Sequence, residues 1–320
     1  MANFPTFEPD GSWIESLRGD KNTVDPWKPY SFSTEKELTL SGRIETVNTI
    51  FLTNRECPYH CLMCDLWKNT TDKKVPSGAI PAQIELALSN LPPAKHIKLY
   101  NSGSFFDTAA IPLEDYPNIA SLLSEYETVI VENHPRLTSD HILTFRDLIK
   151  GQLQVALGLE TTHPEVLKRL NKKMTLDDFT RSTQWLNKNK IPIRAFILLK
   201  PPFMSYTEGI HWAKHAIGYA LDAGAASCVI IPTRSGNGAM EWLEQNEYFS
   251  PPDIQALEEV VEFGIKQKKG QVFADLWDIE LFSNCDKCLD KRKNRLEQMN
   301  LKQSVSAPVN CTCLPVTDDT

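Results

Sequence analysis

The chain has 320 residues, of which 41% are hydrophobic and 23% charged, an ordinary balance for a globular protein with a sizeable core. Its formal net charge of −7 argues weakly against nucleic-acid binding, because proteins that bind DNA or RNA usually carry a basic surface. No apolar run approaches membrane-spanning length and no secretory signal is visible, so the eight cysteines favour metal binding over disulfides.

Residues 1–45 show no clear periodicity, and we expect them to form an irregular N-terminal wrap. From residue 46 onward, short apolar runs alternate with longer amphipathic runs, which is the pattern of βαβ units around a buried parallel sheet. The sequence therefore predicts an α/β fold, a partial (β/α)6 TIM-like barrel. Strands are predicted at 46–52, 96–101, 128–132, 153–159, 193–199 and 228–232, and helices at 81–91, 119–126, 139–150, 164–170, 176–189 and 206–223.

A further helix is predicted at 252–268, and one more strand at 271–277. Beyond this point the composition shifts to Cys, Lys and Arg. We therefore predict three segments: the N-terminal wrap 1–45, the barrel 46–276, and a Cys-rich metal-binding C-terminal extension 277–320.

Three cysteines after the first predicted strand carry the strongest functional signal. Cys57, Cys61 and Cys64 have the spacing C-x3-C-x2-C. Three thiolates on one loop can bind three irons of a [4Fe–4S] cube and leave the fourth iron open, whereas full ligation takes four cysteines. An open metal position is a place for chemistry. A zinc loop or three unrelated thiols is the alternative, although zinc sites favour C-x2-C pairs joined to a distant second pair.

This motif and its position after the first strand resemble those of the radical S-adenosylmethionine (SAM) enzymes. The resemblance implies that Cys57, Cys61 and Cys64 are the catalytic cluster ligands, that the open iron binds SAM, and that the reduced cluster cleaves SAM to a 5′-deoxyadenosyl radical. It also implies that Met63 lies against the adenine and that an electron donor such as a flavodoxin or ferredoxin is a partner. Because an iron–sulfur cluster requires a reducing compartment, we expect the protein in the cytoplasm.

The carboxyl ends of barrel strands, where working residues lie, select further candidates. After the second predicted strand, Gly103 suits close backbone approach to a ligand, and Asn101, Ser102 and Ser104 offer oxygen acceptors for an ammonium group. Many radical SAM enzymes have a Gly-Gly-Glu-type segment here that binds the SAM amino group. A plain strand-to-loop turn is the alternative.

Charged residues end the next strands. Glu132 and Glu160 are predicted to bind the SAM ribose hydroxyls or amino group, since a buried carboxylate is costly unless it is paired or reaches a ligand; helix capping is the alternative. Lys200 can meet the SAM carboxylate or a substrate anion. Arg234, as a bidentate clamp, and Lys172 are candidate substrate residues, with ordinary surface charge as the alternative.

Four segments narrow the resemblance to one branch of the family. This branch contains the archaeosine-forming radical SAM enzyme, which acts on a modified deazaguanine base in tRNA, and is distantly similar to the radical SAM domain of the Elongator catalytic subunit. The similarity covers roughly residues 40–315. The segments are Asn-Ser-Gly-Ser-Phe-Phe-Asp at 101–107, Gly-Leu-Glu-Thr at 158–161, Asn-Lys-Lys at 171–173 and Leu-Leu-Lys-Pro-Pro-Phe at 198–203.

The tail holds a second cysteine group, Cys285, Cys288, Cys311 and Cys313, spaced C-x2-C-x22-C-x-C. Four soft ligands in two pairs suit a tetrahedral zinc site. They also suit an auxiliary [4Fe–4S] cluster, and unligated thiols are a third interpretation. A charged helix is predicted between the pairs. Such a run of charges marks a solvated helix face more often than an RNA contact.

These observations together predict a radical SAM enzyme that removes a hydrogen atom from a substrate at the barrel mouth. One candidate substrate is a tRNA base or a related deazapurine. The alternatives are a radical SAM enzyme that acts on a small molecule or peptide, and a non-enzymatic zinc-binding protein that interacts with RNA.

Overall fold

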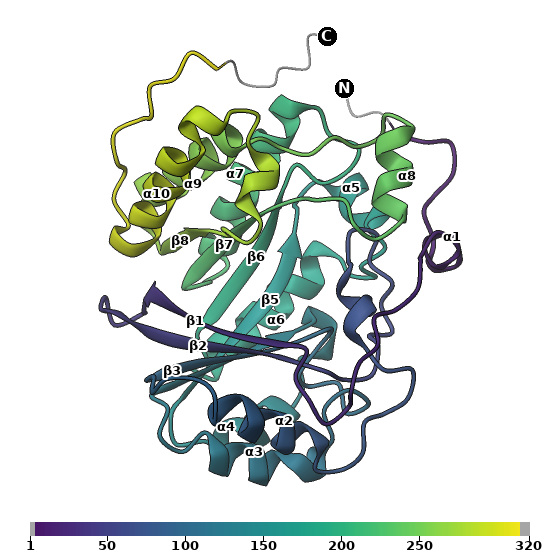
Figure 1. Ribbon diagram of the computed structural model, residues 1–320, viewed down its shortest axis with the longest axis vertical. Helices are drawn as coiled ribbons and strands as arrows, with labels where there is room; N and C mark the ends of the chain where they lie inside the picture. Colours follow the sequence, from purple (N-terminus) through teal and green to yellow (C-terminus); the bar gives the residue numbers. More distant parts are fainter. Residues whose placement is uncertain (1–3, 314–320) are drawn as a thin grey trace.

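One curved sheet organises the molecule, for which a computed structural model describes residues 4–313 (Figure 1). Within these residues eight strands follow one another in the order β1 to β8. The strands from β2 to β8 are parallel, and β1 pairs antiparallel with β2. The strands are β1 (Ser31–Leu38), β2 (Ile44–Leu52), β3 (His96–Asn101), β4 (Thr128–Asn133), β5 (Gln152–Glu160), β6 (Ile193–Leu199), β7 (Ser227–Pro232) and β8 (Gln271–Ala274).

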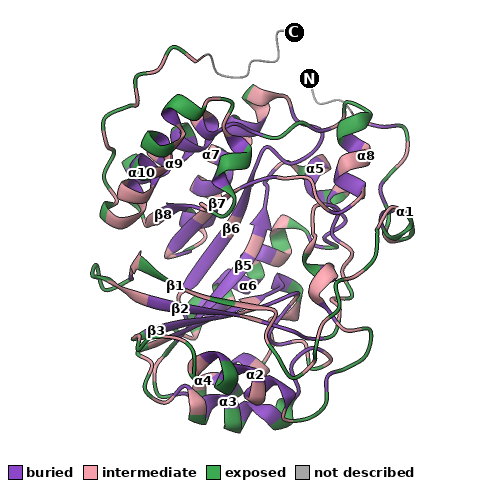
Figure 2. Cartoon of the chain, in the orientation of Figure 1, coloured by how far each residue is buried: buried purple, intermediate pink, exposed green. Residues whose placement is uncertain are grey.

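Helices cover the outer face of the sheet and leave the inner face to a cavity. The strands from β3 to β8 are mostly buried, whereas β1 at the edge has no buried residue and the helices expose one side (Figure 2). The α-helices are α1 (Gly11–Ser16), α2 (Ala79–Leu88), α3 (Tyr116–Leu122), α4 (His141–Leu148), α5 (Pro164–Arg169), α6 (Leu176–Lys188), α7 (Tyr206–Asp222), α8 (Ala239–Gln245), α9 (Ile254–Gln267) and α10 (Asp286–Lys302). Short 3₁₀ helices are η1 (Leu66–Asn69), η2 (Leu113–Asp115), η3 (Pro135–Leu137) and η4 (Ile279–Phe282).

The predicted fold class, a partial barrel with a Cys-rich extension, is confirmed. All six predicted strands are present, and the additional strand is β8, three residues shorter than predicted. The prediction of an irregular N-terminal wrap is wrong for residues 11–16, which form α1, and for residues 31–38, which form β1. Helix α8 was not predicted. None of the helices in the described chain combines the length and the apolar character that a membrane crossing requires.

Side chains that alternate between the two faces of each strand separate the core from the cavity. On β3, Ile97 and Leu99 pack in the main hydrophobic core, while Lys98 and Tyr100 line the cavity on the other face. Successive side chains of a strand point to opposite faces, so one strand can serve both regions. The core therefore lies between sheet and helices, and the barrel interior remains available for ligands.

Strand β1 is held across the barrel by a buried ionic cluster. Glu37 on β1 accepts hydrogen bonds from Lys98 on β3 and from Arg194 on β6, whose Nη1 lies 3.2 Å from Glu37 Oε2. Burial on its own would raise the pKa of Glu37, but Arg194 and Lys98 more than offset this and lower it. Since β1 and β6 are not neighbours in the sheet, these contacts cross the barrel interior.

Replacing Glu37 with glutamine should destabilise the fold by about 1.5–3 kcal/mol, because two buried cations lose a charged acceptor. Chemical denaturation at neutral pH measures this. The matched change Glu35→Gln should cost less than about 1 kcal/mol, since the Glu35 side chain is 55% exposed. The Glu37 contribution is present above the ordinary carboxyl pKa of 4.5 and is lost as pH falls below it. Equal losses in the two variants would contradict this role of Glu37.

Candidate active site

The loop between β2 and η1 carries Cys57, Cys61 and Cys64. Ligands of one tetrahedral metal ion with metal–sulfur bonds of 2.3 Å lie about 3.8 Å apart. Within the described residues, the groups whose ligand atoms all lie within 4.8 Å of one another do not include these three cysteines. At least one pair of sulfurs is therefore more widely spaced. This spacing argues against one tetrahedral ion held by all three thiolates.

Two asparagines fix the backbone of this cysteine loop. Asn171 donates from Nδ2 to the carbonyl of His60 at 2.7 Å. Asn237, which precedes α8, donates from Nδ2 to the carbonyls of Leu62 at 2.7 Å and Cys64 at 3.1 Å. Sequence reasoning missed Asn237, because it lies more than 170 positions from the loop that it holds.

An aromatic contact supports the same loop from another side. Tyr59, between the first two cysteines, stacks on His134 with ring centroids 4.0 Å apart. Burial lowers the pKa of His134 to about 3, so its ring is neutral at physiological pH. His134 was also missed as a functional residue, although it directly follows β4.

Burial strongly disfavours ionised cysteines in the metal-free loop. It raises the pKa of Cys57 to about 11 and the pKa values of Cys61 and Cys64 to about 12, despite the opposing charge of Lys172. Metal ligands of this type bind as thiolates, so assembly of a cluster must release their protons.

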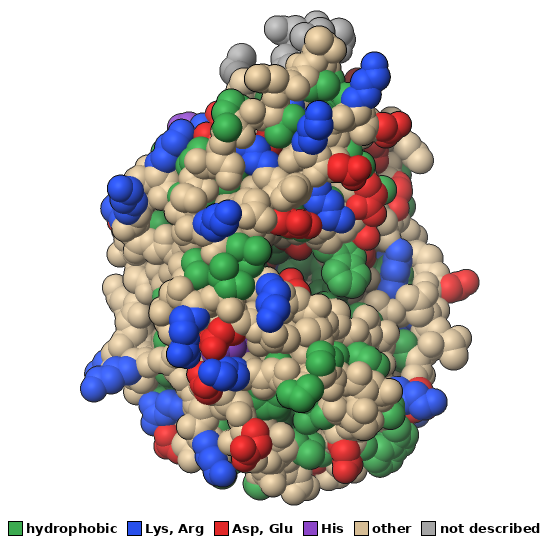
Figure 3. Space-filling view, turned by 60° about the vertical axis from the view of Figure 1, so that its left-hand side comes forward, with side chains coloured by type: hydrophobic (Ala, Val, Ile, Leu, Met, Phe, Trp, Pro, Cys, Tyr) green, Lys and Arg blue, Asp and Glu red, His purple; other side chains and the backbone are tan. Residues whose placement is uncertain are grey.

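A cavity of about 960 Å³ fills the inside of the curved sheet and includes all three cysteines in its lining. Typical small-molecule sites span about 300–1,000 Å³, so the space suits a cofactor together with part of a substrate. In Figure 3, one face of the molecule is hollowed near its middle, with acidic, hydrophobic and basic side chains at its edge. Lys and Arg side chains are dispersed over this face rather than gathered around the hollow.

Several predicted SAM-binding residues line this cavity: Met63, Ser102, Gly103, Glu132 and Glu160. Gly103 has φ of +151°, and a Cβ there would lie 3.1 Å from Cys57 Cβ. The missing side chain therefore leaves a cradle directly beside the first cysteine. A ligand held at an open iron requires such close backbone approach.

Glu132 is a half-buried carboxyl group with no cation bound to it. Within residues 4–313 it forms no ion pair, and its Oε2 accepts a 3.1 Å hydrogen bond from the backbone N–H of Asn101. Burial raises the pKa of Glu132 to about 8, with only partial opposition from that hydrogen bond and from the charge of Lys172. A carboxyl group that lines a cavity and forms no ion pair within the described residues suits a cationic ligand, because the ligand would supply a partner charge.

Glu160, by contrast, already has a partner. Lys172 Nζ lies 2.6 Å from Glu160 Oε1, and both side chains are nearly buried. Burial alone would lower the pKa of Lys172, but Glu160 and then Cys61 more than offset this and raise it. Lys172 is therefore a charged group beside the cysteine loop, and not the surface residue that was the alternative.

Three predicted site residues lie elsewhere. Lys200 is absent from the cavity lining, and its Nζ donates to the carbonyl and hydroxyl oxygens of Ser250 at 2.8 and 2.5 Å. Ser104 is hydrogen-bonded to Asn133. The side chain of Asn101 is buried but does not line the cavity. We therefore leave these three side chains out of the proposed SAM site.

The outer part of the cavity carries charge and aromatic rings. Arg234 lines it and pairs with Asp278 at 2.9 Å and with Asp275 at 3.7 Å. Any substrate anion would compete with these carboxylates for Arg234. The aromatic side chains, which sequence reasoning did not group, are Tyr30, Phe51, Tyr100, Phe196 and Trp277. Phe51 contacts the rings of Tyr30, Tyr100 and Trp277, and Tyr100 also contacts Phe196, with ring centroids 5.7–6.2 Å apart.

The predicted C-terminal cysteine group is brought together. The sulfur atoms of Cys285, Cys288, Cys311 and Cys313 all lie within 4.8 Å of one another. None of the four lines the large cavity.

The sequence of the chain is similar to those of known proteins. Residues 51–203 match the sequence profile of the Radical SAM superfamily. The uncharacterized protein MJ0550 of Methanocaldococcus jannaschii is 24% identical over 317 residues, which span 92% of this chain and 87% of that protein. The archaeosine synthase subunit beta of Thermococcus kodakarensis is 24% identical over 210 residues, 63% of this chain and 65% of that protein.

Solved structures share the fold. The Elp3 of Methanocaldococcus infernus superposes with a TM-score of 0.52 at 14% identity and covers 79% of this chain and 63% of its own. Methylornithine synthase superposes with a TM-score of 0.54 at 13% identity, over 72% of this chain and 65% of its own. The sequence match, together with the three-cysteine loop on a partial barrel, shows that residues 51–203 of the chain form a radical SAM domain.

Proposed function

We propose that this enzyme cleaves SAM reductively at a [4Fe–4S] cluster held by Cys57, Cys61 and Cys64. When bound, the reduced cluster and SAM would supply a 5′-deoxyadenosyl radical, which removes a hydrogen atom from the substrate. The observation that carries the proposal is the common cavity: the three thiols, the Gly103 cradle and the unpaired Glu132 carboxyl all line it.

The chain's own residues would bind and orient the cofactor. Glu132 would accept hydrogen bonds from the SAM ammonium group, and Gly103 would let the backbone approach it. Met63 would pack against the adenine. Glu160 holds Lys172 beside the cysteine loop, where the cation would face the negative charge of the cluster.

Anaerobic reconstitution tests the proposal directly. The protein is loaded with iron and sulfide, then given SAM and dithionite, and the products are separated by chromatography. We expect 5′-deoxyadenosine to form only when reductant and SAM are both present. A fully reconstituted protein that makes no 5′-deoxyadenosine would overturn the proposal.

Binding of SAM should release about one proton per protein near pH 7. Glu132, with a pKa of about 8, is mostly protonated there, and a bound ammonium group would favour its ionised form. Calorimetry in two buffers of different ionisation enthalpy measures the released proton. The Glu132→Gln variant should lack this release, and SAM affinity should rise with pH between 6 and 8 only in the unsubstituted protein. The same release from both proteins would contradict the role of Glu132.

For the substrate, we propose a tRNA base or a related deazapurine, with a flavodoxin or ferredoxin as electron donor and the cytoplasm as the compartment. Support comes from the two archaeosine synthase beta subunits among the relatives, of Thermococcus kodakarensis and Methanosarcina acetivorans. The aromatic side chains in the outer cavity suit a planar ring.

Salt-dependent binding of unmodified tRNA separates this substrate from a small molecule or peptide. Phosphate contacts make affinity fall steeply as salt rises, so tRNA binding should weaken at least about tenfold between 50 and 200 mM salt. Binding that is absent at low salt would favour the small-molecule or peptide alternative, which the dispersed basic residues of Figure 3 support. The non-enzymatic interpretation is wrong, because the chain carries a radical SAM domain.

A further inference from the structure

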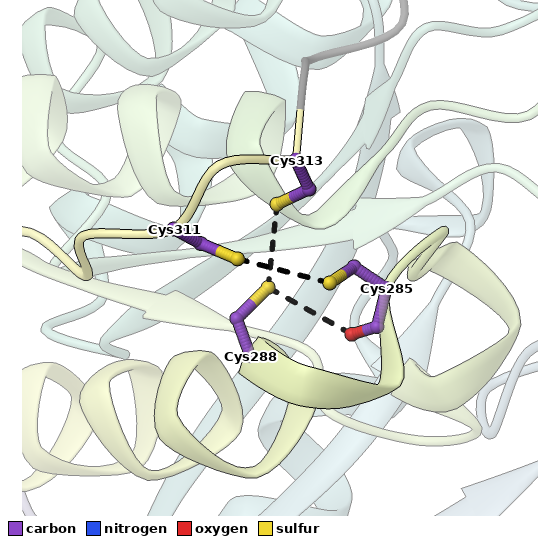
Figure 4. A group of neighbouring side chains, drawn as sticks. All are labelled: Cys285, Cys288, Cys311 and Cys313. Carbon is purple, nitrogen blue, oxygen red and sulfur yellow. Dashed lines mark hydrogen bonds between the residues drawn. The ribbon is translucent and has the colours of Figure 1, made fainter.

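The four C-terminal cysteines have the spacing of ligands around one ion. Cys285 Sγ lies 3.8 Å from Cys311 Sγ, and Cys288 Sγ lies 3.5 Å from Cys313 Sγ (Figure 4). A tetrahedral ion with metal–sulfur bonds of 2.3 Å places its sulfur ligands about 3.8 Å apart. The four side chains point toward a common centre in Figure 4. We propose that they bind a single tetrahedral zinc ion.

The same spacing argues against an auxiliary [4Fe–4S] cluster. In a cube each thiolate binds a different iron, so the sulfurs are held farther apart than around one ion. The sulfurs of Cys57, Cys61 and Cys64, by contrast, do not all lie within 4.8 Å of one another. Four thiolates in a tetrahedron also complete the coordination of zinc and leave no open position, which is typical of structural zinc.

The surroundings compensate the charge of such a site. Zinc with four thiolates carries a net charge of −2, and the N-terminus of the 17-residue helix α10, which favours negative charge, begins between Cys285 and Cys288. Arg292, one turn further along, donates from Nε to Cys288 Sγ at 3.3 Å. Arg292 is also paired with Glu258 of α9, so the cation is fixed in place. Metal ligands are commonly held by such hydrogen bonds.

The zinc ion would fasten α10 in a position where it protects the barrel edge. On β8, the backbone N–H groups of Val272 and Ala274 donate to Gln303 Oε1 and Asn300 Oδ1, both at 2.7 Å. The same two amide side chains donate back to the carbonyls of Val272 and Ala274 at 2.9 Å. Side chains of α10 and of the residue after it thereby take the place of a ninth strand, since an unpaired sheet edge otherwise invites association.

Metal counts on three proteins test the proposal. Anaerobically reconstituted wild-type protein should contain about four irons and about one zinc per chain. The Cys311→Ser/Cys313→Ser variant should keep about four irons and lose the zinc. The Cys57→Ser/Cys61→Ser/Cys64→Ser variant should keep the zinc and lose the iron. Thr312→Ser, a change between the two tail cysteines, is the matched control and should retain both metals.

Cobalt substitution provides a second measurement that does not depend on the folding of a tail variant. Co²⁺ added to the zinc-stripped triple variant should give the visible absorption of tetrahedral thiolate coordination. About eight irons without zinc in the wild-type protein would overturn the proposal, as would about five irons without zinc. Zinc that persists in Cys311→Ser/Cys313→Ser would also overturn it. Iron counts at the barrel loop report separately on the proposed SAM chemistry.

Discussion

Replacing Cys61 with alanine should abolish 5′-deoxyadenosine formation, a loss of at least about 100-fold. Cys61 is buried in the loop that holds the proposed cluster, and the loop offers no fourth thiol within its own sequence to replace it. Two thiolates would leave two irons of the cube without protein ligands. The variant should therefore bind little iron after reconstitution, and chromatography of the SAM products should show only background.

Cys228→Ala is the matched control for this experiment. Cys228 is also fully buried, but it lies on β7 in the hydrophobic core and outside both cysteine groups. Its replacement should leave the iron content and 5′-deoxyadenosine formation close to those of the unsubstituted protein. If Cys61→Ala still formed the product at a comparable rate, the assignment of the cluster would be wrong.

The parallel strands could be predicted because burial on both faces produces continuous apolar runs. The prediction of β3 and β6 agrees with the structure at both ends. Strand β1 escaped detection because Glu35 and Glu37 make its sequence resemble an exposed segment. Glu37 is in fact neutralised by Lys98 and Arg194, which come from strands far away in the sequence. Ionic partners of this kind leave no local pattern.

Residues of the candidate site could be predicted where a reactive residue type stands at a recognisable position in the sequence, such as a cysteine motif or a strand end. Cysteine spacing located both cysteine groups, and the strand-end rule located Glu132 and Glu160 in the cavity lining. The same rule selected Lys200, which has a left-handed backbone with φ of +52°. The Lys200 side chain contacts Ser250 and does not line the cavity. Asn237 had no signal, since an amide that holds two carbonyls of a distant loop looks like any loop asparagine.

Replacing Lys172 with methionine should destabilise the protein by about 3–5 kcal/mol, because Glu160 would be left buried and unpaired. The pair is tightly enclosed: a Cβ on Gly158 would lie 2.2 Å from Glu160 Oε1 and 2.5 Å from Lys172 Nζ. Chemical denaturation measures the loss. Lys173→Met, a change at the exposed neighbouring lysine, should alter stability by less than about 0.5 kcal/mol.

The double variant Lys172→Met/Glu160→Gln separates the structural role of Lys172 from its electrostatic role. Removal of both charges should restore much of the lost stability, since the cost comes from the isolated carboxylate. The cation beside Cys57 and Cys61 would still be missing, and a nearby positive charge favours the reduced, more negative cluster. We therefore expect the refolded double variant to have a lower cluster reduction potential and slower 5′-deoxyadenosine formation. If the double variant had the wild-type cluster reduction potential, the role of Lys172 would be only to pair with Glu160.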